Sequence, residues 1–160
     1  MKNIIVIFAT IILSVNAFAQ NGKSIYQKYS DEKGIEAVYV SPAMFKLIGN
    51  LPMDLGEDMN LASIVKSLSG FYLLSSSDPE VGGKIKNDVS KFMKNGKYEL
   101  LMEAKDEGDK MTIYTVNEGD YVTSLVMIAD ELGGGETTFI CLDGRILYSD
   151  LENMIANAVN

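Results

Sequence analysis

The sequence contains no histidine and no tryptophan, and it has one cysteine among its 160 residues. The lack of histidine excludes a Ser-His-Asp triad, a Cys-His pair and a histidine-ligated zinc site. A single cysteine can form neither an internal disulfide nor a multi-thiolate metal site. Because Cys141 lies in the apolar run 139–142, we interpret it as a small buried hydrophobic residue. We therefore expect no cofactor, no metal site and no catalytic residue of these classes.

Positive charge is also scarce. The chain has 14 lysines and arginines against 22 aspartates and glutamates, which gives a net charge of −8 at pH 7. A nucleic-acid-binding protein needs a basic face for the phosphates, and docking on anionic lipid also needs basic residues. We expect neither as a partner, and we attribute the acidic charge to solubility.

Only one long apolar run is present, and it lies at the N-terminus. Residues 4–15 are almost entirely apolar, follow Lys2 and precede Ala17-Phe18-Ala19, a small-x-small pattern typical of signal peptidase sites. The run is shorter than the roughly 20 residues of a membrane span, although an uncleaved anchor remains an alternative. The pattern predicts a signal peptide over residues 1–19, cleaved after Ala19, and a single periplasmic or secreted domain over residues 20–160. Since no cysteine follows the run, we expect no lipid anchor, and no later segment could span a membrane.

Helical periodicity and capping residues predict five helices in the rest of the chain. The longest opens at Asp78-Pro79, an N-cap followed by proline at the first helical position, and ends at Asn95-Gly96. Within it, Gly82 and Gly83 each cost about 1 kcal/mol relative to alanine. Shorter helices are expected over residues 23–30, 41–49 with Ser41 as N-cap, 61–68 with Gly70 as the breaker, and 149–158 behind a capping box.

Segments rich in β-branched and aromatic residues predict strands, four of them in succession. Short connections rich in Gly, Asp and Asn favour antiparallel hairpins between these four. The expected strands cover residues 35–40, a segment beginning over 71–74, and 97–105, 111–116, 121–129 and 137–142. This order predicts an α+β fold with an antiparallel sheet of about five or six strands, ending in a four-strand meander. Helices should pack on one face of the sheet, and the other face should be wet unless a partner covers it.

Two groups of carboxylates are candidates for chemistry. Asp54, Glu57 and Asp58 offer the hard oxygen ligands that calcium prefers, but their spacing matches no EF-hand loop and solvated loop residues explain them equally. Strand alternation would place Glu99 and Glu103 on one face, where paired carboxylates could act as acid and base. The simpler interpretation of this pair is an exposed polar strand face.

Two short motifs also resemble functional sequences. Ser63 and Lys66 form a Ser-x-x-Lys string, although the other motifs of serine–lysine hydrolases are missing. The run 133–135 consists of three glycines but lacks both the lysine and the helix start of a phosphate-binding loop. We interpret it as a flexible hairpin connection.

Tyrosines in the meander indicate a surface for another protein. Tyr114 and Val116 share one face of their strand, and Tyr121 lies nearby in the sequence. Tyrosine is enriched at protein interfaces because it is amphipathic and loses little entropy on ordering. We predict that these three residues form an interaction surface. The alternative is that they line the edge of the core.

The chain resembles a bacterial family known as domain of unknown function 4252. The resemblance covers about residues 26–155 and rests on core and turn patterns: Lys28-Tyr29-Ser30-Asp31, Val38-Tyr39-Val40-Ser41 with Met44-Phe45, Tyr98-Glu99-Leu100-Leu101-Met102, and Leu142-Asp143-Gly144 leading into Leu151 and Ile155. It implies a small exported protein of Bacteroidota, some members of the family being lipid-anchored. It implies no catalytic or binding residues.

These observations favour a non-catalytic, exported module of the cell envelope that binds another envelope protein. The chemistry that is missing and the sheet face left without helices both support this hypothesis. Two alternatives remain open, a small-molecule or calcium-binding domain and a hydrolase that works without histidine.

Overall fold

A computed structural model describes residues 22–50, 59–94, 97–131, 133 and 135–159. The predicted signal peptide and the acidic residues Asp54, Glu57 and Asp58 lie outside these ranges. The elements in chain order are α2 (Gly22–Tyr29), β1 (Glu36–Val40), α3 (Pro42–Asn50), α4 (Met59–Ser67), β2 (Leu68–Ser76), α5 (Pro79–Met93), β3 (Glu99–Asp106), β4 (Asp109–Glu118), β5 (Tyr121–Asp130), β6 (Thr137–Leu147) and α6 (Tyr148–Val159).

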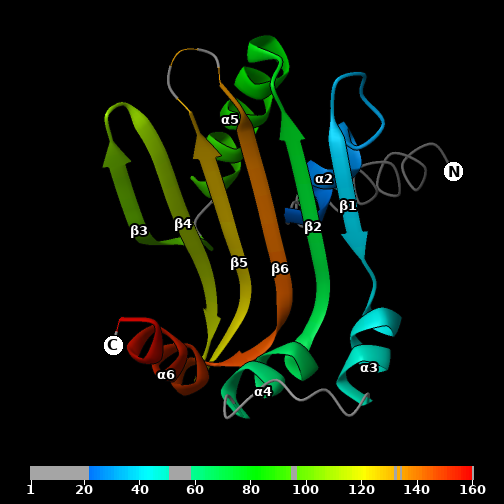
Figure 1. Ribbon diagram of the computed structural model, residues 1–160, viewed down its shortest axis with the longest axis vertical. Helices are drawn as coiled ribbons and strands as arrows, with labels where there is room; N and C mark the ends of the chain where they lie inside the picture. Colours follow the sequence, from blue (N-terminus) through cyan, green and yellow to red (C-terminus); the bar gives the residue numbers. More distant parts are fainter. Residues whose placement is uncertain (1–21, 51–58, 95–96, 132, 134, 160) are drawn as a thin grey trace, which may run out of the picture.

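The strands form one six-stranded sheet in the order β1-β2-β6-β5-β4-β3, and every neighbouring pair is antiparallel (Figure 1). Strands β3 to β6 form the expected four-strand meander. Strand β2 then joins the free edge of β6, and β1 joins β2. The predicted α+β fold with an antiparallel sheet of five or six strands is therefore confirmed.

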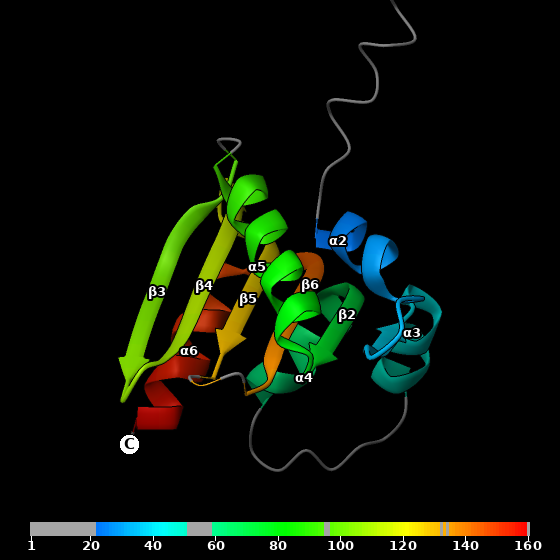
Figure 2. The ribbon, with the colours of Figure 1, turned by 90° about the horizontal axis from the view of Figure 1, so that it is seen from above.

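Helices α2 and α5 lie side by side on one face of the sheet (Figures 1 and 2). Asp78 caps α5 as predicted, because its carboxylate accepts the backbone N–H of Glu80 at 2.8 Å and Pro79 occupies the first helical position. Asp88 of α5 ties the two helices together, accepting from the Tyr29 hydroxyl at 2.8 Å and from Lys28. The hydrogen bond from Lys28 holds the pKa of Asp88 below its usual value.

The main core lies between these helices and the sheet. Leu74 is opposite Phe139 in the register, and Cys141 is opposite Val126. These strand residues form one buried cluster with Ile85, Val89 and Phe92 of α5. Cys141 has no exposed surface, and burial raises the pKa of its thiol, so the interpretation as a buried hydrophobic residue is confirmed. We refer to this side of the sheet as the helix face.

Helices α3, α4 and α6 lie at the end of the sheet where β1 and β6 finish (Figure 1). A second, smaller core forms there. Its buried residues are Ile64, Val122 and Ile146, and Leu68 and Leu151 pack against them.

Of the element boundaries that differ from the sequence prediction, two are explained by hydrogen bonds or strand pairing. Helix α4 ends at Ser67, whose hydroxyl donates to the Ile64 carbonyl at 2.7 Å. Leu68 already pairs with β6, so Gly70 lies within β2 at a register shift and does not break the helix. Helix α6 begins at Tyr148, one residue before the expected capping box, because the Tyr148 N–H is bound by the Asp120 carbonyl at 3.0 Å.

The longest helix in the described ranges is α5, with 15 residues. Among the described residues, no helix combines the length and the apolar character that crossing a bilayer requires.

Candidate functional site

The face of the sheet opposite α2 and α5 carries an apolar row that crosses all six strands. Residues that are opposite in an antiparallel register point to the same face, so the pairing assigns each side chain to a side. The middle row on this side is apolar at every position: Val38, Leu73, Ile140, Met127, Ile113 and Met102. Figure 1 shows this side of the sheet toward the reader, with α2 and α5 behind the strands.

Two further rows flank the middle one. The first consists of Val40, Phe71, Leu142, Leu125, Thr115 and Glu99, and the second of Glu36, Ser75, Thr138, Ala129, Met111 and Ala104. We call these three rows together the open face. None of its apolar side chains is buried, and those on the two edge strands are the most exposed, with Val38 at 47% and Met102 at 41%.

The sequence predicted a face without helices that is wet unless a partner covers it, and the apolar character of the open face was not expected. Side chains alternate between the two faces along a strand, and β2, β5 and β6 carry apolar residues in both alternating sets of positions. Both faces of these three strands are therefore apolar. With about 4.8 Å between strands and about 3.4 Å per residue, the apolar positions cover roughly 400 Å². Soluble monomers rarely expose a larger continuous apolar patch, and patches of this size are often functional.

A hollow of about 290 Å³ lies at the end of the open face where β3 turns into β4. Its floor is made by the short or flexible side chains of Ala104, Met111 and Ala129. Its charged lining residues are four carboxylates and two lysines: Asp106, Asp109, Asp130, Glu131, Lys105 and Lys110. We call this region the acidic hollow. Within the described ranges, no group of acidic residues and cysteine has the geometry to hold a metal ion.

The expectation that Glu99 and Glu103 share a strand face is wrong. A register shift between Leu100 and Met102 sets Glu99 opposite Thr115 and Glu103 opposite Thr112, which lie on opposite faces. A β-bulge of this kind reverses the side-chain alternation beyond it. The two carboxylates therefore cannot act together on one substrate.

Each of these glutamates also has partners of its own. Asn117 donates to the Glu99 carboxylate at 3.2 Å. Glu103 pairs with Lys105 at 2.8 Å and with Lys110 at 2.9 Å, and these hydrogen bonds lower its pKa to about 2. A carboxylate with so low a pKa is a poor general acid or base near neutral pH.

Ser63 and Lys66 do not form a catalytic pair in the structure. The Ser63 hydroxyl donates to Asp150 at 2.9 Å, which joins α4 to α6. The partner of the Ser63 hydroxyl is therefore a carboxylate that links two helices, and not a lysine that could activate it as a nucleophile.

The three residues predicted as an interaction surface lie elsewhere than on the open face. Tyr114 is opposite Val126 on the helix face and packs against the main core, as the alternative for it anticipated. Val116 is opposite Ser124 on the same side. The Tyr121 ring lies 4.2 Å from the Arg145 guanidinium. Binding of a partner by these residues stays a prediction. A sheet face without helices was expected, but the apolar residues that form the open face were not identified.

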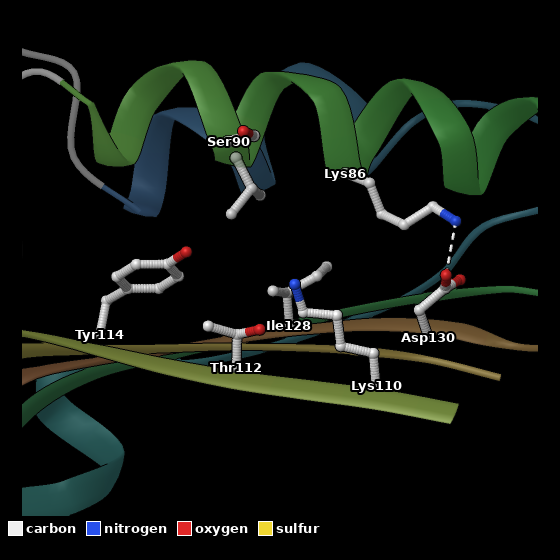
Figure 3. Close-up of a pocket in the computed structure, with 8 residues that line it drawn as sticks. Lys86, Ser90, Lys110, Thr112, Tyr114, Ile128 and Asp130 are labelled. Atoms are coloured by element: carbon white, nitrogen blue, oxygen red, sulfur yellow. Dashed lines mark hydrogen bonds and ion pairs between the residues drawn. The ribbon is translucent and has the colours of Figure 1, made fainter. Parts of the chain in front are cut away.

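Tyr114 also lines a small pocket on the helix face, between α5 and strands β4 and β5 (Figure 3). Its volume is about 210 Å³. Lys86 in this pocket is paired with Asp130 at 2.7 Å, and Lys110 is paired with Glu103. Pockets for small molecules usually measure about 300–1,000 Å³. The pocket is therefore small for a ligand, and both of its cations already have anionic partners.

Comparisons with known proteins give one match. A family model described as Domain of unknown function (DUF4252) matches residues 29–154, which extend from the end of α2 into α6. No curated protein and no solved structure matches the chain.

Proposed function

The chain belongs to the family described as Domain of unknown function (DUF4252), and because that description assigns no activity we propose a function from the structure itself. In this proposal the protein is an exported, non-catalytic module of the cell envelope that binds another protein through the open face of its sheet. The observation that carries the proposal is the apolar row from Val38 to Met102, which stays accessible across all six strands.

Burial of this surface would provide the driving force for association. At about 25 cal/mol per Å², covering roughly 400 Å² of apolar surface contributes about 10 kcal/mol before the costs of association. A sheet face of this kind is normally covered, either by a second layer of the same domain or by a partner. Among the described elements, α2 and α5 form the layer on the helix face, and α4 and α6 pack over Val122 and Ile146 at one end of the sheet. None of the side chains in the middle row is buried beneath such a layer.

Export is supported by the sequence and agrees with the single thiol. Residues 4–15 with Ala17-Phe18-Ala19 have the pattern of a cleaved signal peptide. Cys141 is buried, so the thiol is protected from the oxidising conditions outside the cytoplasm.

Two substitutions on β3 test the proposal with a matched control. Met102 lies on the open face and Leu100 on the helix face, opposite Tyr114, and the two are 41% and 59% exposed. Met102→Asp should lower recovery of the partner about 10-fold or more, because burying an unpaired carboxylate costs more than about 1.4 kcal/mol. Leu100→Asp should leave recovery unchanged.

The measurement is quantitative mass spectrometry of proteins crosslinked in cells to the tagged, full-length chain, expressed in its own organism. Urea unfolding provides the stability control, and surface changes of this kind should shift the free energy of unfolding by about 0.5 kcal/mol at most. Equal recovery with the two variants would contradict the proposal.

A further inference from the structure

We propose that the partner presents a basic amphipathic polypeptide segment, with apolar side chains on the open face and a lysine or arginine in the acidic hollow. This inference rests on the proposed function and specifies the chemistry of the partner. Three features support it: the sign of the charges around the open face, the shape of the acidic hollow, and the net charge of the chain.

The charged residues in the three rows are acidic, and in the hollow beside them carboxylates outnumber lysines. Glu36 and Glu99 lie at opposite edges of the open face, and Asp106, Asp109 and Glu131 border its end. Lys105 and Lys110 also line the hollow, but their register pairs them with each other on the helix face, where both contact Glu103. A partner for this surface must therefore bring positive charge to one end of an apolar strip.

The acidic hollow has the shape that a long basic side chain requires. Lysine and arginine place their aliphatic stems along apolar surface and keep the charged end in a polar environment. Ala104, Met111 and Ala129 provide the apolar floor, and the carboxylates of Asp106 and Glu131 stand at its border. Glu131 is held in place because its carboxylate accepts the backbone N–H of Glu136 at 3.4 Å.

Carboxylates outnumber ammonium groups in and around the hollow. Lys86 is paired with Asp130 at 2.7 Å, and Lys105 and Lys110 share Glu103. The four carboxylates of the hollow and that of Glu103 make five, against three ammonium groups.

A second copy of the chain fits this surface less well. Two copies with a net charge of −8 each repel one another, and charges of the same sign across an interface disfavour association. The three rows span roughly 600 Å² when measured by strand spacing. A stable interface between two folded proteins usually buries about 800 Å² on each side, so a single segment matches the available area better.

The test uses two synthetic amphipathic peptides of equal length and identical leucine pattern, one with lysine and one with glutamate at the polar positions. Fluorescence anisotropy measures their binding to the mature protein. We expect the lysine peptide to bind at least about 10-fold more tightly than the glutamate peptide, and to lose affinity as salt rises from about 0.05 to 0.3 M.

Two neutralising triple variants locate the binding. Asp106→Asn with Asp109→Asn and Glu131→Gln should weaken the lysine peptide about 10-fold, as loss of roughly 1.4 kcal/mol predicts. The matched control, Asp31→Asn with Glu32→Gln and Glu80→Gln, removes the same charge from outside the open face and should change affinity by less than about 2-fold.

The outcomes separate this inference from the proposed function. Equal binding of both peptides, weakened in both by Met102→Asp, would overturn the basic segment and leave the open face as a docking surface. Equal weakening by the two triple variants would also overturn it, because net charge alone would then explain the binding. Absence of binding, or binding that ignores Met102→Asp, would overturn both proposals.

Discussion

Leu74→Ala is expected to lower the free energy of unfolding by about 3 kcal/mol, within the range for a buried leucine truncated to alanine. The same change at its neighbour Leu73 should cost about 1 kcal/mol or less, because a partly exposed side chain loses less buried area. Leu74 has no exposed surface and packs under α5, whereas Leu73 lies in the middle row of the open face. Urea unfolding of the mature protein measures both values.

This pair of variants tests whether the open face is uncovered in the isolated chain. The two leucines are adjacent on β2, so they share strand propensity and the same backbone environment. A cost of about 3 kcal/mol at both positions would mean that the open face is buried as well. The proposed docking surface would then not exist.

Gly82→Ala and Gly83→Ala are expected to have opposite effects on stability. A Cβ on Gly82 would lie 2.4 Å from the Thr137 hydroxyl oxygen and 2.9 Å from the Thr137 Cβ, so α5 would have to move away from β6. Overpacking of this kind costs about 1–3 kcal/mol. A Cβ on Gly83 meets nothing within 4 Å, so alanine there should add about 1 kcal/mol through helix propensity alone.

Thermal and urea unfolding of the two variants distinguish packing from propensity. If both alanines stabilise the protein, helix propensity decides at both positions and α5 is not in tight contact with β6. If both destabilise it, the helix start requires glycine for a reason other than the contact with Thr137.

Local signals in the sequence predicted most of the secondary structure. Asp78-Pro79 placed the start of α5 because N-capping and the fixed backbone of proline act within a few residues. The turns after β3 and β4 were found from short runs of Asp, Glu, Asn and Gly, and Gly108 and Gly119 do adopt positive φ there. Hairpins between neighbouring strands follow directly from such turns, so the meander was predictable.

Features that depend on distant contacts were not predictable in this way. The pairing of β2 with β6 joins residues far apart in the sequence, and no local pattern specifies it. The bulge near Leu101 changes the side on which Glu103 lies, and alternation alone cannot detect such a shift.

The sequence of β5 does indicate that both faces of this strand are apolar. Strand β5 carries Val122 and Val126 at one parity and Leu125 and Met127 at the other. A strand that is apolar at both parities indicates that both of its faces are covered. Tyrosine is a residue type typical of interfaces and favours Tyr114, whereas the apolar positions of the open face are aliphatic side chains and methionines except for Phe71.

The acidic composition is consistent with an accessible apolar face. A net charge of −8 keeps copies of the chain apart and opposes self-association through the open face. The same charge attracts a basic partner, so solubility and partner selection would depend on one property of the sequence.

The most direct test of the docking surface is photo-crosslinking in cells from single positions. Met127 lies in the middle row of the open face, and Leu100 is exposed on the other side of the sheet. With a benzophenone amino acid at either position, a specific protein partner should be captured from position 127 and not from position 100. Capture from position 100 alone, or equal capture from both, would contradict the assignment of the open face as the docking surface.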